Sequence, residues 1–462
     1  MCLGNPYIFY GESVLKPPSA QGSFSPQMLS ALGDTNTELN DERRDPQAPS
    51  PLSKILAKGR VRGGLAILGP AFVASVAYVD PGNFATNFQG GSEHGYELVW
   101  VIVMANMMAI LIQYLTAKLG IYSGKSLPEM CREAFPRRAN VLLWVQAEVI
   151  AMATDLAEFT GAAVGLNLVF GIPLFIAGLI TAAVAFLILA LEQRGYRKFE
   201  LAIIALLSFV ALGFAVDFFE VGRQSYSAMA KGLIPHIGGG DTLSLAVGII
   251  GATVMPHVVY LHSALQKNRI RPVNESEGRT LLRYNSADCW IGLGLAGFVN
   301  LAMLCIAAAL FHHPGLTGVN DLGPVHAHLA TMVGGFAALS FGVALIASGL
   351  SASSVGTYAG QVVMAGFINR SIPLFLRRAL TMIPSLLILG LAVNTTNALV
   401  YSQIVLSFGI PFALVPLILL TRKRERLGYM VNNRLTSATM WLITAVIAGL
   451  NVYLIYSSIA GL

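Results

Sequence analysis

Two short polar segments interrupt long apolar stretches, and they carry the side chains best suited to hold a metal ion. The first reads Asp80-Pro81-Gly82-Asn83 and follows apolar residues that begin at Leu65. The second, about halfway along the chain, reads Ala252-Thr253-Val254-Met255-Pro256-His257. Proline lacks an N–H and glycine is conformationally permissive, so a helix cannot continue normally through such segments. Each break frees backbone carbonyls of the preceding turn, around Ala77 and near Ala252.

The donor atoms at the two breaks favour a transition metal. Asp80 supplies an anionic oxygen, Asn83 a neutral oxygen and Met255 a soft sulfur. Mixed oxygen and sulfur donors suit Mn²⁺, Fe²⁺, Co²⁺ or Cd²⁺, whereas Na⁺, Mg²⁺ and Ca²⁺ gain little from a thioether. We therefore expect Met255 to select against alkaline-earth ions. Taken alone, Asp-Pro-Gly-Asn is also ordinary turn chemistry, and a buried methionine is usually packing.

A third group of polar residues lies within one apolar segment. Glu148, Asp155 and Glu158 are separated by seven and three residues, which places them on one face of a helix. Three carboxylates on one face favour a proton path, with Arg377 and Arg378 as candidate partners. The alternative is a static ion-pair network that only holds helices together.

Single polar residues in other apolar runs have two interpretations each. His257 adjoins the second break and can titrate near neutral pH, whereas His262 is the better candidate for a satisfied core histidine. Gln403 and Asn451 are amides that either hydrogen-bond between helices or swing onto a metal. Four further histidines gather in one loop, where a solvated role is favoured over metal capture: His312, His313, His326 and His328.

The composition requires a membrane. The chain of 462 residues is 55% hydrophobic and only 12% charged, with 30 Lys and Arg residues against 24 Asp and Glu. Soluble domains carry about 25% charged residues, so lipid must cover much of this surface. The basic residues are spread over short loops and not gathered on one face or tail, so the net charge does not indicate a nucleic-acid partner, and none is expected. The four scattered cysteines form no C-x-x-C pair, which argues against disulfides and a cysteine metal site.

Eleven segments are long and apolar enough to span a bilayer. They are expected at 64–89 and 243–266, both broken, and at 98–120, 140–168, 174–192, 198–218, 288–311, 328–355, 371–393, 400–421 and 436–460. Residues 1–63 are rich in Pro, Ser, Asn, Asp and Glu and lack periodicity, which predicts a largely disordered tail.

The basic residues orient these spans. All but two of the 30, Arg223 and Lys231, fall in the tail or in alternate loops and their flanks on one side. The positive-inside rule predicts that this side of the protein, with the N-terminus, faces the cytoplasm. The protein is expected in the cell (inner) membrane. An odd number of spans then puts the C-terminus outside.

The broken spans indicate an internal repeat. They lie five spans apart and cross in opposite directions, as in an inverted repeat whose unwound segments meet near the bilayer midplane. The expected units are 64–218, 243–421 and a final helix at 436–460.

Both breaks resemble a known family. The stretches Asp80 to Asn87 and Gly251 to His257, with Thr154-Asp155-Leu156-Ala157-Glu158, are similar to signatures of the Nramp proteins, proton-coupled divalent metal symporters with a bacterial MntH branch. The resemblance covers about residues 60–460. It implies an all-α LeuT-like fold and a transported ion such as Mn²⁺ or Fe²⁺ that is a substrate, with no cofactor.

The resemblance also implies roles for individual residues. Metal ligands would be Asp80, Asn83, Met255 and the carbonyls of Ala77 and Ala252, joined by Gln403 in an occluded state. Proton handling would fall to Asp80, Asp155, Glu158 and His257, with Arg378 further along. Eleven spans and a short loop between spans 7 and 8 match a bacterial member.

Two other functions remain as alternatives. A sodium-coupled amino-acid transporter of the same fold would hold a substrate carboxylate at a free helix N-terminus, but Asp80 would repel it. An intramembrane hydrolase using His257 and His262 is disfavoured, because the chain has no H-E-x-x-H pair and their spacing puts them about 140° apart on a helix.

Overall fold

The computed structural model describes residues 50–57, 59–192, 196–222, 224–236, 238, 240–267, 269–313, 319, 321–391 and 393–460. Every regular element within these ranges is helical. Most of the tail predicted to be disordered, residues 1–49, lies outside them. Its described end is helical, contrary to that prediction, in α2 (Pro51–Leu56) and at the start of α3 (Arg60–Ile67). Ser50 caps α2 and Leu52 is buried in a small cluster with Ile67, which explains the local order.

Both predicted breaks are confirmed. The first span consists of α4 (Pro70–Ala77) and α5 (Pro81–His94), and the other of α12 (Gly240–Thr253) and α13 (Pro256–Lys267). Each second half begins at a proline, which is favoured at the first helical position because its missing N–H would have no partner there.

Nine further long helices complete the bundle in the part of the chain that the structure describes. They are α6 (Val99–Ser123), α8 (Arg137–Phe170), α9 (Leu174–Glu192), α10 (Tyr196–Glu220), α14 (Glu275–Phe311), α16 (Gly335–Ile368), α17 (Leu374–Gly390), α18 (Thr395–Thr421) and α20 (Arg434–Ala460). Short helices in the connections are α7 (Leu127–Ala134), α11 (Tyr226–Lys231), α15 (Leu322–Met332) and α19 (Arg424–Leu427), followed by the 3₁₀ turn η1 (Gly428–Met430).

Seven of the described helical segments are long and apolar enough to cross a membrane. They are α6, α8, the stretch Thr242–Lys267 that joins α12 and α13, α14, α16, α18 and the stretch Arg434–Ser457 of α20. The described apolar part of α9, Leu174–Ile188, is shorter.

The span predicted at 328–355 begins and ends too early, because the long helix here, α16, runs from Gly335 to Ile368. The first residues of the predicted span belong to α15. Gly334, with φ of 140°, separates the two helices. The helix runs on through a serine-rich stretch, where the hydroxyls of Ser351, Ser354 and Thr357 donate to carbonyls one turn earlier in the same helix.

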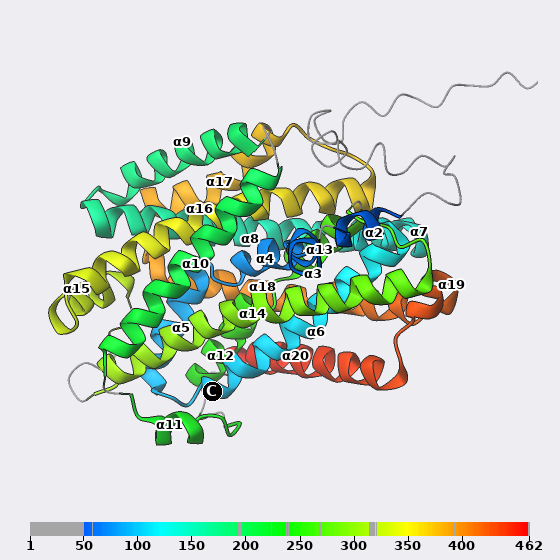
Figure 1. Cartoon of the computed structure of the whole chain (residues 1–462). Coiled ribbons are helices and arrows are strands. Elements are labelled where there is room, and N and C mark those ends of the chain that lie inside the picture. Colours follow the sequence, from blue (N-terminus) through cyan, green and yellow to red (C-terminus); the bar gives the residue numbers. More distant parts are fainter. Residues whose placement is uncertain are drawn as a thin grey trace, which may run out of the picture.

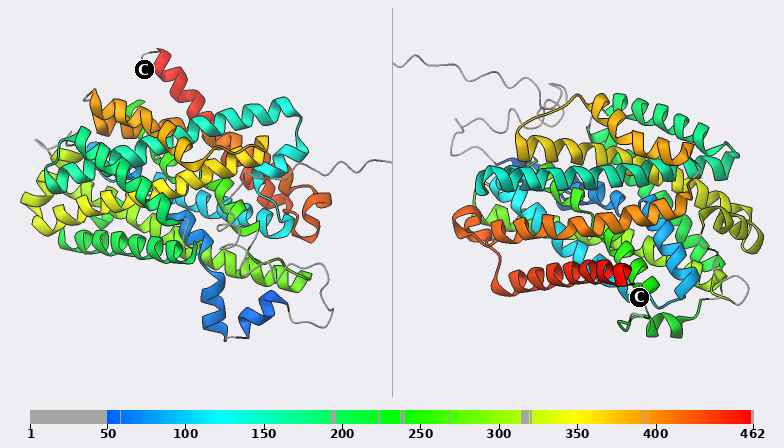
Figure 2. Two further views of the ribbon diagram at one scale, coloured as in Figure 1. Left: turned by 90° about the horizontal axis from the view of Figure 1, so that it is seen from above. Right: turned by 180° about the vertical axis from the view of Figure 1, so that it is seen from behind.

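The helices form a bundle with distinct ends (Figure 1). Helices α7 and α19 lie at one end and α15 at the other, while α8 and α16 run through the bundle in close contact. Helix α20 packs on α18 and α12 at the outside, and α2 and α3 project from the bundle in the view from above (Figure 2).

Aromatic packing fixes the position of α5, which carries half of the first polar segment. Phe84 and Phe88 are fully buried between Phe214 of α10 and Phe341 of α16. Edge-to-face pairs join Phe84 to Phe214 at 5.4 Å and Phe88 to Phe341 at 5.1 Å between ring centroids. The start of α5 is thereby anchored on two neighbouring helices.

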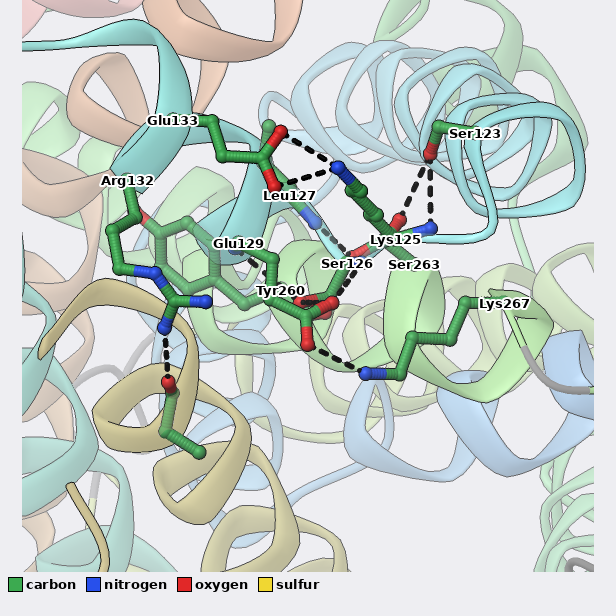
Figure 3. A network of polar contacts seen from close by, with 11 residues as sticks. Ser123, Lys125, Ser126, Leu127, Glu129, Arg132, Glu133, Tyr260, Ser263 and Lys267 are labelled. Carbon is green, nitrogen blue, oxygen red and sulfur yellow. Dashed lines mark hydrogen bonds and ion pairs between the residues drawn. The ribbon is translucent and has the colours of Figure 1, made fainter. Parts of the chain in front are cut away.

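Helix α7 joins two other helices at its end of the bundle (Figure 3). The Glu129 carboxylate accepts from Lys267 of α13 at 2.8 Å, and the backbone N–H of Leu127 donates to Ser263 of α13 at 2.8 Å. Arg132 donates to the carbonyl of Ala365 on α16 at 2.9 Å. This short helix therefore ties α13 to α16.

Candidate metal site and buried carboxylates

Asp80 occupies the N-cap of α5 and is fully buried. Its Oδ1 accepts from the backbone N–H of Asn83 at 2.8 Å. A side-chain oxygen at this position satisfies one of the free N–H groups of the helix start. Because the chain is unwound just before it, the carboxylate is held at the break and not along a helix side.

Asn83 connects the two broken spans. Its side-chain Nδ2 donates to Asp80 Oδ1 at 2.6 Å and to the carbonyl of Ala252 at 3.2 Å. The Ala252 carbonyl is available because its helical partner four residues on would be Pro256, which has no N–H. Asn83 Oδ1 is buried without a hydrogen-bond partner among the described residues. A buried, unpaired oxygen beside a carboxylate fits cation binding.

The carbonyls of the unwound turn before Asp80 have distinct surroundings. Tyr78 O accepts from Asn300 of α14 at 2.9 Å, and Val79 O accepts from the Ser348 hydroxyl of α16. Ala77 stands four residues before Pro81, so the helix supplies no N–H to its carbonyl. Neither Asn300 nor Ser348 was predicted to lie at the break. Asn300 is, like Gln403, a lone amide in an apolar run, which is the signal by which it could have been found.

Gln403 reaches the site from α18. Its Nε2 lies 3.4 Å from Asp80 Oδ2, and its Oε1 is buried without a partner in the part of the chain that the structure describes. A β-carbon on Gly251 would lie 1.9 Å from the Gln403 carbonyl, so glycine is required for α12 to approach α18 this closely. Gln403 therefore lies beside the first break, and its part in metal binding stays a prediction.

Met255 lies fully buried between α12 and α13, where its carbonyl accepts weakly from Val259 at 3.4 Å. No group of three or more His, Cys, Asp or Glu side chains that could hold a metal occurs within the described ranges. The candidate donors are instead one carboxylate, side-chain amides, backbone carbonyls and the thioether. Such a mixed set suits a borderline-soft transition-metal ion.

A second buried polar group lies on α8. Arg378 of α17 is 3.5 Å from Asp155 Oδ1 and donates to Ser353 O at 2.9 Å and Thr357 Oγ1 at 2.6 Å, both on α16. Glu158 is fully buried one turn further, and neither of its oxygens has a hydrogen-bond partner among the described residues. His257 of α13 reaches the same helix through Thr154, at 3.2 Å.

Glu148 is separate from this group. It pairs with Arg377, whose Nη1 lies 3.2 Å from Oε1, and accepts from the Trp144 indole at 2.9 Å. Its side chain is 20% exposed. This geometry matches the static ion-pair alternative for Glu148 and Arg377, two turns away from Asp155 along α8.

Two other predicted polar residues have structural partners. His262 bonds through Nδ1 to Gln113 at 2.9 Å, as a satisfied core histidine would. Asn451 of α20 donates to the Ser407 carbonyl of α18 at 3.0 Å and accepts from its hydroxyl at 2.9 Å. The Ser407 carbonyl lacks its helical partner because Pro411 has no N–H. Asn451 thus joins two helices and does not reach Asp80 in this structure.

The four histidines predicted to share a loop form no metal-binding cluster within the described ranges, and His326 and His328 lie on the short helix α15. His312 contacts Ser92 O at 3.1 Å, His313 contacts Ala309 O at 3.0 Å, and His328 contacts Pro324 O at 2.9 Å. His326 packs near the ring of Phe341.

This chain is similar over most of its length to known metal transporters. A relative from Bacillus subtilis, a divalent metal cation transporter MntH, is 47% identical over 418 residues, 89% of this chain and 98% of its own length. The protein of that name from Deinococcus radiodurans is 44% identical over 431 residues, 93% of this chain and 99% of its own. The crystal structure of an Eremococcus coleocola manganese transporter superposes with a TM-score of 0.79 at 33% identity, covering 92% of this chain and 91% of that one.

More distant structures share the fold alone. The nucleobase-cation-symport transporter Mhp1 in a closed conformation gives a TM-score of 0.57 at 14% identity, over 84% of this chain and 90% of that one. The family described as natural resistance-associated macrophage protein-like (Nramp) matches residues 71–457, which include both breaks and the α8 carboxylates. This chain therefore belongs to the Nramp family.

Proposed function

We propose that the protein imports divalent transition-metal ions, Mn²⁺ or Fe²⁺ and also Co²⁺ or Cd²⁺, together with protons. The observation that carries this proposal is Asn83, whose side chain joins the Asp80 carboxylate to the freed carbonyl of Ala252. Asp80, Asn83, Met255 and the carbonyls of Ala77 and Ala252 are the proposed ligands, with Gln403 completing the shell when the site is closed. The metal is the cargo, and no cofactor is needed.

The burial of Asp80 supports the proposed proton coupling. A carboxylate without solvent favours its neutral form, so Asp80 carries a proton while it is free of metal. Metal binding requires the ionised carboxylate, so the proton must leave as the ion arrives. Asp155, Glu158 and His257 are the proposed acceptors further along, and Arg378 balances the charge of Asp155.

The proposed setting is a bacterial inner membrane. Eleven crossings, with the N-terminus inside and the C-terminus outside, place nearly all basic loops in the cytoplasm. Exposed apolar side chains on the outer helices, such as Leu187, Leu387 and Leu442, supply lipid-facing surface. A negative interior then drives both ions inward, by about 2.3 kcal/mol per charge at 100 mV.

The two alternatives have less support. An amino-acid carboxylate would meet the buried Asp80 carboxylate at the same break, at a cost in like-charge repulsion. The hydrolase interpretation is wrong, because the chain belongs to a family of transporters and His257 and His262 bond to different partners, Thr154 and Gln113.

The experiment uses purified protein in sealed liposomes with a pH dye inside. Addition of Mn²⁺ outside, at a negative internal potential, should produce both metal entry and internal acidification. The Asp80→Asn variant, which keeps the size of the side chain, should lose both signals. Metal entry without acidification would refute the coupling, and metal entry through Asp80→Asn would refute the assigned site.

A further inference from the structure

Four glycines on α16 recur at intervals of seven residues, at Gly335, Gly342, Gly349 and Gly356. Residues seven apart lie on nearly the same face of a helix. A β-carbon on Gly342 would lie 2.5 Å from Val169, and one on Gly349 would lie 2.6 Å from the Glu158 carbonyl, both on α8. The missing side chains therefore allow α16 to lie directly against α8.

Gly356 differs from the other glycines in what it faces. A β-carbon there would lie 2.9 Å from Glu158 Oε2, 3.3 Å from Asp155 Oδ1 and 3.4 Å from Glu158 Oε1. The three atoms nearest to a β-carbon at Gly356 are thus carboxylate oxygens, whereas a β-carbon at Gly349 would first meet backbone atoms of α8. Both carboxylates converge on the space that a methyl group would fill.

The polar surroundings of this space are unequal. Asp155 has Arg378, which is itself held by the Ser353 hydroxyl and by Thr357, the residue next to Gly356. Glu158 is fully buried, with neither oxygen paired among the described residues. One turn of α16, from Ser353 to Thr357, therefore holds Arg378 and also leaves the space in front of Glu158, at Gly356.

We propose that Gly356 is a positioning residue for proton transfer between Glu158 and Asp155. Its missing side chain lets the two carboxyl groups face each other, so that the O–H bond of one breaks as an O–H bond forms on the other. The pair keeps its total charge during this exchange. The other charged or titratable groups around Glu158 are Arg378 of α17, Asp80 at the first break and His257 of α13.

This inference rests on the proposed proton coupling and is tested with the same liposomes. The Gly356→Ala variant should lower the ratio of protons to Mn²⁺ carried by about tenfold or more, because misplacement by about 1 Å can cost a hundredfold in rate. Its Mn²⁺ affinity, measured by calorimetry, should stay within about twofold of the unmodified protein, because the metal donors are elsewhere. The added methyl meets the end of a flexible side chain, so the fold should accommodate it.

A second substitution separates positioning from packing. Glu158→Asp shortens the side chain by one methylene and makes room for the new methyl group. The Gly356→Ala/Glu158→Asp double variant should therefore recover a larger proton ratio than either single variant. Gly349→Ala, whose methyl meets the backbone, should not be rescued by Glu158→Asp, and Gly294→Ala on α14, with nothing within 4 Å, should behave as the unmodified protein.

The outcomes are distinct. An unchanged proton ratio in Gly356→Ala overturns the inference, and so does a loss of ratio that Glu158→Asp fails to restore. A parallel loss of Mn²⁺ affinity and proton flux in Gly356→Ala also overturns it, because that is the result of a packing defect. Absence of proton flux in the unmodified protein would instead refute the proposed function.

Discussion

The side chain of Gln403 lies against the backbone of Gly82, so closely that a β-carbon on Gly82 would stand 1.9 Å from Nε2 and 2.2 Å from Cδ. From this position Gln403 Nε2 lies 3.4 Å from Asp80 Oδ2. Gly82 therefore has a second role besides permitting the break in the helix. It provides the surface on which α18 approaches the proposed metal site.

The first prediction concerns this contact. Gly82→Ala should displace Gln403 and weaken Mn²⁺ binding by about tenfold, the equivalent of about 1.4 kcal/mol or one hydrogen bond to a charged group. Gln403→Ala should have a similar effect, and the double variant should be no worse than either single one. Titration calorimetry measures the three affinities. Fully additive losses would contradict a shared mechanism.

The second prediction concerns selectivity. Met255→Ala removes the one soft donor, so Ca²⁺ and Mg²⁺ should begin to compete with Mn²⁺ and Cd²⁺ affinity should fall most. Uptake of Mn²⁺ in the presence of excess Ca²⁺ measures the effect. Met108 of α6, another buried methionine, supplies the control substitution. Discrimination that survives Met255→Ala would mean that the sulfur only packs.

A third prediction concerns helix α18, which contains Pro411. Asn451→Ala leaves the Ser407 carbonyl without the donor that replaces the missing N–H of Pro411, which should destabilise the protein by about 1–3 kcal/mol. Mn²⁺ affinity should change less than twofold, because Asn451 does not contact the proposed ligands. Thermal unfolding in detergent and calorimetry are the two measurements. A tenfold loss of affinity with unchanged stability would support the alternative in which Asn451 swings onto the metal.

The fourth prediction concerns pH and α7 (Figure 3). Burial raises the pKa of Glu129, but the hydrogen bond and charge of Lys267, with donors from Ser126, outweigh burial and hold the pKa below its usual value. A lowered pKa in the folded state adds stability that is present above the unfolded pKa of about 4.3 and is lost as pH falls through the folded pKa. The contribution should be about 1 kcal/mol, given partial exposure.

Lys267→Met should therefore lower the stability of the protein at pH 7 and reduce its further loss between about pH 5 and pH 3. Lys125→Met is the matched control. Lys125 precedes α7 and pairs with Glu133, which lies on α7 as Glu129 does, at 2.6 Å. The Lys125 and Glu133 side chains are 47% and 44% exposed, so solvent screens this pair. Equal effects of the two substitutions would show that α7 is not held through Lys267.

The sequence predicted the parts of the fold that depend on local chemistry. Pro81 and Pro256 end their helices whatever surrounds them, so both breaks were predictable. The positions of the Asp80 and Asn83 side chains could be predicted from the break, because Asp80 is the N-cap of α5 and Asn83 lies in its first turn. Family membership could also be predicted, because the two signatures recur together in the right spans.

Features that depend on packing between distant segments could not be predicted. The bounds of α16 coincide with Gly334 and with Asn369, whose positive φ angles end the helix at either side and which a hydropathy pattern does not record. The division of the α8 carboxylates depends on which arginine of α17 reaches which acid. Asn451 had two interpretations until its partner Ser407 was known. The glycine repeat of α16 is visible in the sequence, but its meaning depends on the carboxylates of α8.

The most direct test of the account is a crystal grown with Mn²⁺ and measured at the manganese absorption edge. The account predicts one anomalous peak within about 2.0–2.6 Å of a carboxylate oxygen of Asp80, in contact with the sulfur of Met255 and the carbonyl of Ala252. Asp80→Asn should remove the peak. Manganese bound elsewhere in the bundle, with no peak between Asp80 and Met255, would contradict the account.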